Sequence, residues 1–392
     1  MKREMSPETN AVVGCASAFL SPSEVAPLKT ELAQPLDWDA LQRMADDHSV
    51  MPLVAYVVCR HAGDLVPPNI LQRFRERFIR ITQDSLAGAQ EWQRVLRALG
   101  EAGVPVISFK GPALALTAYR NLALREFHDL DLMVRSEDVL RVRDVLVGDG
   151  YSLGSPLLRQ TDAALVRSSN RQVYFTNKER GTSVDLHWGA VHEMFSFQLD
   201  ADQLWQAAYV ERQEGMSFLS LSPEHLLLYL CAHGAKHCWR NLCWLCDIAC
   251  HIQAHPRMDW DACTRLAELT SCGLLLKHAL LLSEQVLGLQ LPERIKHYAD
   301  DGRARVLAET ARAFLFREHG DHPGYLRPLQ YHLAFAKGWR DGASLVFARV
   351  FVPAEPDWHR VRLPRPLYFL YYLVRPIRFV VERLAVAARP SR

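Results

Sequence analysis

Two aspartates, Asp129 and Asp131, stand two residues apart in the apolar run His128-Asp-Leu-Asp-Leu-Met-Val134. In an extended strand, residues two apart project to the same side, so this spacing presents both carboxylates to one point. The residues between and after them, beginning with Leu130, face the opposite side and predict a core there. Two carboxylates placed in this way can bind a hard divalent cation.

A third carboxylate follows in the run Ser183-Val-Asp-Leu-His187, which alternates in the same manner. Asp185 and His187 share one face of this predicted strand, and two apolar residues share the other. Three converging carboxylates suit Mg²⁺, which combines a few carboxylates with water and substrate phosphates. Such a site can hold one ion or two, and two ions would clamp the attacking and leaving oxygens of a phosphoryl displacement. The pattern therefore predicts nucleotidyl or phosphoryl transfer.

A glycine turn precedes the acidic pair. The predicted strand over residues 104–109 ends at Lys110-Gly111, and Pro112 then opens an apolar helix. A glycine at a strand-to-helix turn lets backbone N–H groups approach a phosphate, and Lys110 adds a positive charge. Because Pro112 has no N–H, the phosphate cradle would depend on Gly111, Ala113 and side chains.

The sequence resembles a known family in three segments: Phe109-Lys-Gly111, Arg125-Glu-Phe-His-Asp-Leu-Asp-Leu132 and Val184-Asp-Leu-His-Trp188. This pattern is similar to the poorly characterised nucleotidyltransferase family of the polymerase-β-like superfamily. The later run Leu226 to Ile252 is similar to the helical region of that family.

The resemblance implies that Asp129, Asp131 and Asp185 are metal ligands and that Lys110 and Gly111 lie at the nucleotide phosphates. The broader superfamily usually has Gly-Ser or Gly-Gly at this turn, whereas this chain has Lys-Gly-Pro, which leaves the phosphate donor open. Relatives are often associated with natural-product or polysaccharide pathways.

A second group of polar residues follows Ser222-Pro-Glu224, a strong helix start. If one helix runs unbroken from there, a single stripe carries His233, His237, Arg240, Trp244, Asp247 and His251. The stripe could line a cleft in which His233, Lys236, His237 or Arg240 contact triphosphate oxygens and Asp247 orients a histidine or accepts a proton. The alternative is that these are ordinary polar residues locking the helix against the sheet.

Zinc is a weaker interpretation of the same segment. His233 and His237 have ligand spacing, but the position after His233 is Gly234 where zinc proteases have glutamate, and no third ligand is evident. Cys243 and Cys246 have a two-residue gap without a matched second pair. Buried core thiols are the favoured interpretation.

The favoured function is a Mg²⁺-dependent nucleotidyltransferase that moves a nucleoside monophosphate from a nucleoside triphosphate to a small molecule, sugar or peptide. Asp129 and Asp131 would bind both metals, and Asp185 would bind the catalytic ion and help deprotonate the acceptor. Arg125 is counted with the nucleotide-binding residues, and His187 would assist the acceptor or product. Two alternatives stay open: phosphoryl or glycosyl transfer from a nucleotide-linked donor, and a non-catalytic nucleotide- or peptide-binding module with a decayed site.

Composition fits a cytoplasmic enzyme. The 392 residues are 49% hydrophobic and carry a formal net charge of +2, which gives no general case for nucleic-acid binding. The nine cysteines are an odd number crowded into apolar sequence, which favours reduced thiols. Neither a signal peptide nor a spanning helix is expected.

The predicted fold class is α+β, with a small mixed sheet between two helical regions. We expect a flexible N-terminus over residues 1–22, a helical segment over 23–100, an α/β core over 101–200, a helical region over 201–340 and an irregular, proline-interrupted basic aromatic tail over 341–392. In the tail, aromatic residues interleave with Arg360, Arg362, Arg365, Arg375, Arg378 and Arg383. This tail could contact a membrane surface or a peptide, or simply pack by its aromatic residues. A protein that works as a nucleic-acid or membrane-associated partner through this tail is a third possibility.

Overall fold

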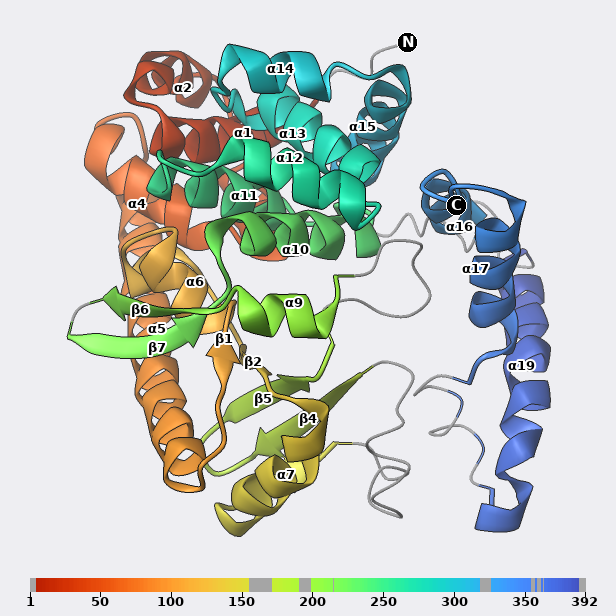
Figure 1. The fold of residues 1–392 in the computed structure, drawn as a ribbon. Coiled ribbons are helices and arrows are strands. Elements are labelled where there is room, and N and C mark those ends of the chain that lie inside the picture. The colour runs from red at the N-terminus through yellow and green to blue at the C-terminus, as the bar shows by residue number, and fades with distance from the viewer. Residues whose placement is uncertain are drawn as a thin grey trace.

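The protein is α+β, as predicted: a mixed sheet lies between helices from both ends of the chain (Figure 1). The computed structural model describes residues 5–154, 171–189, 199–213, 215–317, 326–353, 357, 361 and 363–387. The described helical region packs above one end of the sheet, and the last helices form a separate pair at its side.

The N-terminal region consists of five helices: α1 (Pro7–Leu20), α2 (Val25–Leu32), α3 (Trp38–Asp47), α4 (Met51–His61) and α5 (Pro68–Glu101). The prediction of a flexible N-terminus is wrong for residues 7–20, because they form the capped and buried helix α1. The Ser6 hydroxyl accepts a hydrogen bond from the Thr9 N–H, and Pro7 occupies the first turn. The small side chains of α1, among them Ala11 and Cys15, are fully buried. Such small residues give a weak sequence signal although they pack closely.

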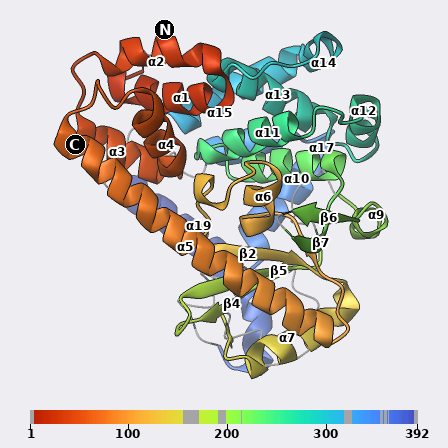
Figure 2. The same cartoon turned by 90° about the vertical axis from the view of Figure 1, so that its left-hand side faces the viewer.

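The long helix α5 connects two hydrophobic cores. Its first half contributes Phe74 and Ile81 to the core of the helical region, and its second half contributes Trp92 and Val95 to the core beneath the sheet. Figure 2 shows α5 running from the N-terminal helices across the sheet toward α7 (Val139–Gly148). On the sheet, the Trp92 ring lies 4.9 Å from Phe218, and its indole N–H donates to the Ser108 hydroxyl over 2.7 Å.

The sheet has the strand order β3-β4-β5-β2-β1-β7-β6. Its strands are β1 (Ile107–Ser108), β2 (Asp129–Met133), β3 (Ser152–Leu153), β4 (Gln172–Asn177), β5 (Thr182–His187), β6 (Tyr209–Gln213) and β7 (Met216–Ser220). The pairs β2–β5 and β1–β7 are parallel, and the other pairs are antiparallel. The predicted β4–β5 hairpin is confirmed, whereas β1 is shorter than expected.

The β6–β7 hairpin corrects the expectation that the chain is helical throughout after residue 201. Its register pairs Tyr209 with Ser220 and Gln213 with Met216, and the turn includes Gly215 with φ of 79°. β6 reads Tyr-Val-Glu-Arg-Gln, in which three polar residues follow one another, so no alternation of apolar residues marks it as a strand. This hairpin extends the sheet beyond β1 and makes it larger than predicted.

Short helices and the C-terminal region complete the described fold. They are α6 (Gly111–Thr117), α9 (Ala201–Gln206), α10 (Pro223–Lys236), α11 (Cys243–Ala254), α12 (Trp260–Leu269), α13 (Gly273–Leu287), α14 (Glu293–Ala299), α15 (Gly302–Leu315) and α16 (Leu326–Leu333). As predicted, Ser222 caps α10, which begins at Pro223, and its hydroxyl accepts a hydrogen bond from the His225 N–H.

The prediction of one unbroken helix after Ser222 is wrong. Helix α10 ends at Lys236, and Cys238 and Trp239 take left-handed conformations with φ of 55° and 52° before α11 begins. The turn folds the fully buried Trp239 ring back over Gly234, where any Cβ would overlap the indole. Gly234 is therefore a packing requirement.

We expect Gly234→Ala to destabilise the protein by about 1–3 kcal/mol, because the methyl group overpacks the site against a rigid ring. Gly100→Ala is the matched control, since a Cβ at this position in α5 meets no atom within 4 Å. It should stabilise by about 0.5–1 kcal/mol. Urea unfolding measures both changes, and an equal effect at the two glycines would contradict this account.

The tail is more regular than predicted. Helices α17 (Trp339–Phe351) and α19 (Tyr371–Ala387) pack together, and α19 continues through Pro376, which removes only one helical hydrogen bond. Arg375 and Arg378 turn inward to the buried Asp357, while Leu373, Ile377 and other apolar residues of α19 are exposed. Outside the described residues lie Arg360 and Arg362, and the side chains of Arg365 and Arg383. Within the described chain, no helix is both long and apolar enough to cross a membrane.

Candidate metal and nucleotide site

The central parallel strands bring the predicted carboxylates together. In the register of β2 and β5, Asp131 is paired with Asp185, and Asp129 with Ser183. Because side chains alternate along a strand, both aspartates of β2 and Asp185 share one face of the sheet. The leucines and valines between them, such as Leu130 and Val184, pack into the core on the opposite face. The sequence period therefore predicted this face correctly.

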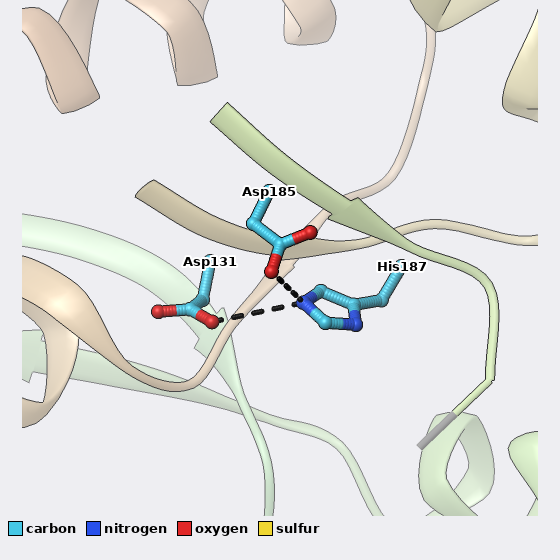
Figure 3. A group of neighbouring side chains, drawn as sticks. All are labelled: Asp131, Asp185 and His187. Atoms are coloured by element: carbon cyan, nitrogen blue, oxygen red, sulfur yellow. Dashed lines mark ion pairs between the residues drawn. The ribbon is translucent and has the colours of Figure 1, made fainter. Parts of the chain in front are cut away.

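Asp131, Asp185 and His187 form a tight group (Figure 3). The imidazole Nε2 lies 3.2 Å from Oδ2 of Asp185 and 3.6 Å from Oδ1 of Asp131. All three side chains are buried, and their ligand atoms lie within 4.8 Å of one another. Across the part of the chain that the structure describes, no other three acidic, histidine or cysteine residues are placed closely enough to share an ion.

This group differs in one member from the predicted triad of Asp129, Asp131 and Asp185. Asp129 stands on the same face but lies outside the close group, and His187 takes its place. Burial, together with the neighbouring charge of Asp131, raises the pKa of Asp129 to about 6. A ligand role for Asp129 stays a prediction. The position of His187 was readable from the sequence, since it follows Asp185 by two residues.

Electrostatics hold the group together. Burial disfavours the charged form of His187, but the carboxylates of Asp185 and Asp131 outweigh it and raise the pKa of the imidazole to about 9. Burial also acts against ionised Asp131, yet Lys110 and His187 bring the pKa of this carboxyl below its usual range. The group therefore holds negative charge that is balanced by neighbouring positive charge.

The side chain of Lys110 points toward the acidic group. Its Nζ lies 2.8 Å from Oδ1 of Asp131, and both side chains are largely buried. Lys110 thus acts as an internal counter-ion here, and its predicted contact with nucleotide phosphates stays a prediction.

The turn glycine is fixed by its backbone. Gly111 has φ of 53°, and a Cβ there would lie 2.9 Å from the carbonyl oxygen of Asp129. Only glycine allows this close approach of the turn to β2. Its predicted role at a phosphate is compatible with the position and stays untested.

One oxygen of the Asp185 carboxylate has no hydrogen-bond partner, and this bears on whether the group can bind a cation. Its Oδ2 accepts a hydrogen bond from Nε2 of Gln172 over 2.9 Å, whereas its buried Oδ1 has no hydrogen-bond partner. A buried carboxylate oxygen without a partner is costly unless something binds it. Two carboxylates and an imidazole are a suitable donor set for a divalent ion. The residues therefore fit a metal. Gln172 was not predicted, although it lies in register opposite His187.

Helix α10 covers this face of the sheet. The Phe109 ring packs 4.8 Å from Tyr229 of α10 and 5.4 Å from His187. One turn further along, His233 and His237 pack with Trp244 of α11, with ring centroids 4.8–5.6 Å apart. Burial and the charge of Lys236 lower the pKa of His237 to about 3, and that of His233 is also well below its ordinary value. These histidines are neutral and form an aromatic cluster.

Two cations stand beside the cluster. Lys236 is half-buried, has no carboxylate within ion-pair distance in the described residues, and is influenced by the charges of Asp185 and Lys110. Burial is the largest influence and lowers the pKa of Lys236. Arg240 is exposed and donates to the His237 carbonyl oxygen over 3.3 Å. The structure therefore brings Lys236 near the acidic face.

Asp247 and Arg125 pair with each other. Arg125 donates from Nε to Oδ1 of Asp247 over 2.7 Å and from Nη2 to Oδ2 over 3.0 Å, and Tyr119 also donates to Oδ1 over 2.7 Å. Both charged side chains are largely buried. In this arrangement Asp247 contacts no histidine of the predicted stripe, and it connects α11 to the segment before β2. His251 lies elsewhere, with Nε2 2.8 Å from the Pro223 carbonyl oxygen.

The cysteines do not form a metal centre in the described residues. All nine are free, and most are buried. Burial raises the pKa of Cys243 to about 12 and raises that of Cys246 well above its ordinary value, as expected of core thiols.

The fold and the site together define a mixed-sheet α+β protein with a buried group of two aspartates and a histidine that could hold a metal ion. The chain belongs to a family of uncharacterised nucleotidyltransferases, whose model matches residues 34–288. The matched region includes the strands of the acidic group and helices α10 and α11, and ends before the tail. The resemblance seen in the sequence is thereby confirmed. No curated protein and no solved structure matches the chain.

Proposed function

We propose that this protein is a divalent-cation-dependent nucleotidyltransferase that transfers a nucleoside monophosphate to a hydroxyl of a small molecule, sugar or peptide. The observation that carries the proposal is the meeting of Asp131 and Asp185 on neighbouring parallel strands, with one buried oxygen of Asp185 left without a partner. Membership of a nucleotidyltransferase family supports the same reaction class.

The residues take distinct roles in this proposal. Asp131 and Asp185, with Asp129 beside them, would hold Mg²⁺ or a similar ion, which when bound offsets the negative charge of the phosphates. Asp185 orients the acceptor hydroxyl and helps to remove its proton. The hydroxyl oxygen bonds to the α-phosphorus, the bond from that phosphorus to the bridging oxygen breaks, and pyrophosphate leaves with the electron pair. With triphosphate as donor and reduced thiols throughout, we place the reaction in the cytoplasm.

Lys236 is proposed to bind the triphosphate, because it is a cation near the acidic face with no carboxylate of its own within ion-pair distance in the described chain. We expect Lys236→Ala to weaken nucleotide binding by about tenfold, the loss of one charge-assisted contact. Lys277→Ala is the control, since Lys277 lies 3.8 Å from Asp301, away from this face. Calorimetric titration with a non-hydrolysable triphosphate measures both. Equal losses in the two variants would remove Lys236 from the site.

The reaction class is tested with labelled donors. The protein is incubated with Mg²⁺, a cell extract and each nucleoside triphosphate carrying the label at either the α- or the γ-phosphorus. Nucleotidyl transfer places the α-label on the acceptor, whereas phosphoryl transfer places the γ-label there. Neither label appearing on any product, with every nucleotide, would count against an enzymatic role.

A second candidate is a non-catalytic nucleotide-binding module, and the ion pair between Lys110 and Asp131 favours it. A lysine that neutralises a carboxylate in this way allows the group to persist without a metal. Calorimetry separates the two candidates, because an enzyme of the proposed kind gains nucleotide affinity when Mg²⁺ is added. A module with a decayed site binds nucleotide equally with and without the ion.

A further inference from the structure

We propose that His187 is itself a ligand of the bound cation, so that the group formed with Asp131 and Asp185 prefers Mn²⁺ to Mg²⁺. This inference rests on the proposed function, since it concerns the same cation, and it names a nitrogen ligand and a metal preference that three carboxylates alone would not give.

The imidazole nitrogen of His187 lies close to both carboxylates of the group. Nε2 of His187 lies 3.2 Å from one carboxylate oxygen and 3.6 Å from the other, on the side of the ring that faces both (Figure 3). In an octahedral complex with metal–ligand distances of about 2.1 Å, neighbouring ligand atoms are about 3.0 Å apart. The imidazole nitrogen therefore already lies near ligand spacing from each of the two carboxylate oxygens.

His187 and Asp185 are both buried, and each has a polar atom that makes no hydrogen bond. His187 is 5% exposed, and its buried Nε2 forms ion pairs with Asp131 and Asp185 but no hydrogen bond of good geometry. Asp185 is 4% exposed, and its Oδ1 has no hydrogen-bond partner. A cation beside the two carboxylates would replace the proton of the imidazole as the charge that they face, and Nε2 would then be free to bind it.

Neighbouring side chains hold Asp185 and His187 in place. Ligating carboxylates are commonly held by an outer hydrogen bond, and Gln172 gives one to Asp185 over 2.9 Å. The edge of Phe109 packs against His187 and restricts its ring. The Phe109 ring thus supports the imidazole in its place beside both carboxylates.

The types of donor atom in the group determine which metal ion it prefers. Mg²⁺ takes oxygen ligands almost entirely, whereas first-row transition ions accept imidazole nitrogen readily. Replacing one oxygen of a carboxylate site by a nitrogen therefore weakens the site for Mg²⁺ more than for the transition ions. Fe²⁺, Ni²⁺ and Zn²⁺ gain most from an imidazole ligand, and Mn²⁺, which also accepts carboxylate and water, gains relative to Mg²⁺. An alternative position for His187, beside the metal but not bound to it, would leave the preference with the oxygen ligands.

The test uses the full-length protein, stripped of metal and loaded with Mn²⁺ alone. Electron spin-echo modulation detects a ¹⁴N nucleus bound directly to Mn²⁺. We expect this signal in the natural protein, and we expect it to change when the protein is labelled with ¹⁵N-histidine. The labelling arm needs no substitution, so it remains decisive even where a variant fails to fold. Bound Mn²⁺ without a histidine signal would overturn the inference and leave the proposed function standing.

Substitutions of His187 provide a second test of the same inference. His187→Ala and His187→Asn should lose the nitrogen signal, and calorimetry should show their Mn²⁺-to-Mg²⁺ affinity ratio falling by about tenfold or more. Gln172→Leu is the matched control, because it removes a neighbour of the same carboxylate but no nitrogen ligand, so its signal should persist. An unchanged affinity ratio in the folded His187 variants, or a signal that survives in them, would refute the role of His187. Failure of the natural protein to bind either ion would instead refute the cation site and with it the proposed function.

Discussion

Asp131→Asn is expected to lower the rate of nucleotide transfer by about a thousandfold or more, because metal-ion stabilisation supplies several kcal/mol and each 1.4 kcal/mol is tenfold. Asp131 is the residue on which the site depends most, since it contacts both Lys110 and His187. The amide keeps the size of the side chain but removes its charge. A steady-state assay with the acceptor found by labelling measures the loss, and Mn²⁺ titration should show weaker binding in parallel.

The control for this substitution is Asp138→Asn. Asp138 is also a buried aspartate, but its partner is the largely exposed Arg141 at 3.2 Å, outside the site. We expect its activity to stay within about twofold of the natural protein, because exposed ion pairs contribute little. Circular dichroism must first show that both variants are folded. Substantial activity in folded Asp131→Asn would exclude the proposed metal-dependent chemistry.

Asp247→Ala is expected to destabilise the protein by about 3–5 kcal/mol, since it leaves the buried Arg125 guanidinium without its carboxylate. The Tyr119 hydroxyl also loses its acceptor. Equilibrium unfolding in urea measures the effect. The double variant Arg125→Met with Asp247→Leu should recover much of the loss, because removing both charges leaves no uncompensated ion.

The comparison for this effect is Asp261→Ala, which breaks an exposed ion pair with Arg294 at 3.0 Å. Its expected cost is below about 1 kcal/mol. A similar cost at Asp247 and Asp261 would mean that the pair between α11 and the segment before β2 contributes little to the fold. If Asp247→Ala instead lowered the activity without changing the stability, Asp247 would have a role in the reaction.

The strands that carry the acidic group were predictable because polar and apolar residues alternate around Asp131 and Asp185. In β2 and β5, every second residue is apolar and faces a core, so the side on which Asp131 and Asp185 lie follows from the period alone. The resemblance to a nucleotidyltransferase family rested on the same residues. Their exact partners did not follow, because a period fixes the face of a strand but not the distance between side chains on it.

The errors had two physical causes. Helix α1 is buried through small residues such as Ala11 and Cys15, which carry little hydrophobic signal. The break between α10 and α11 depends on left-handed backbone at Cys238 and Trp239, a conformation that those residue types rarely adopt. Tertiary packing of Trp239 against Gly234 stabilises it, and such packing is invisible in a single segment. The assumed stripe joining His233 to Asp247 failed for this reason.

Helix α5 has a consequence for how the chain can be divided. Because Phe74 lies in one core and Trp92 in the other, a cut at residue 100 would take from the sheet the helix that shields its apolar side. The fragment left behind would expose the leucines and valines of β2 and β5 to water and should aggregate. The sheet that carries the acidic group is therefore a poor candidate for transplantation, or for expression, without the helices that precede it.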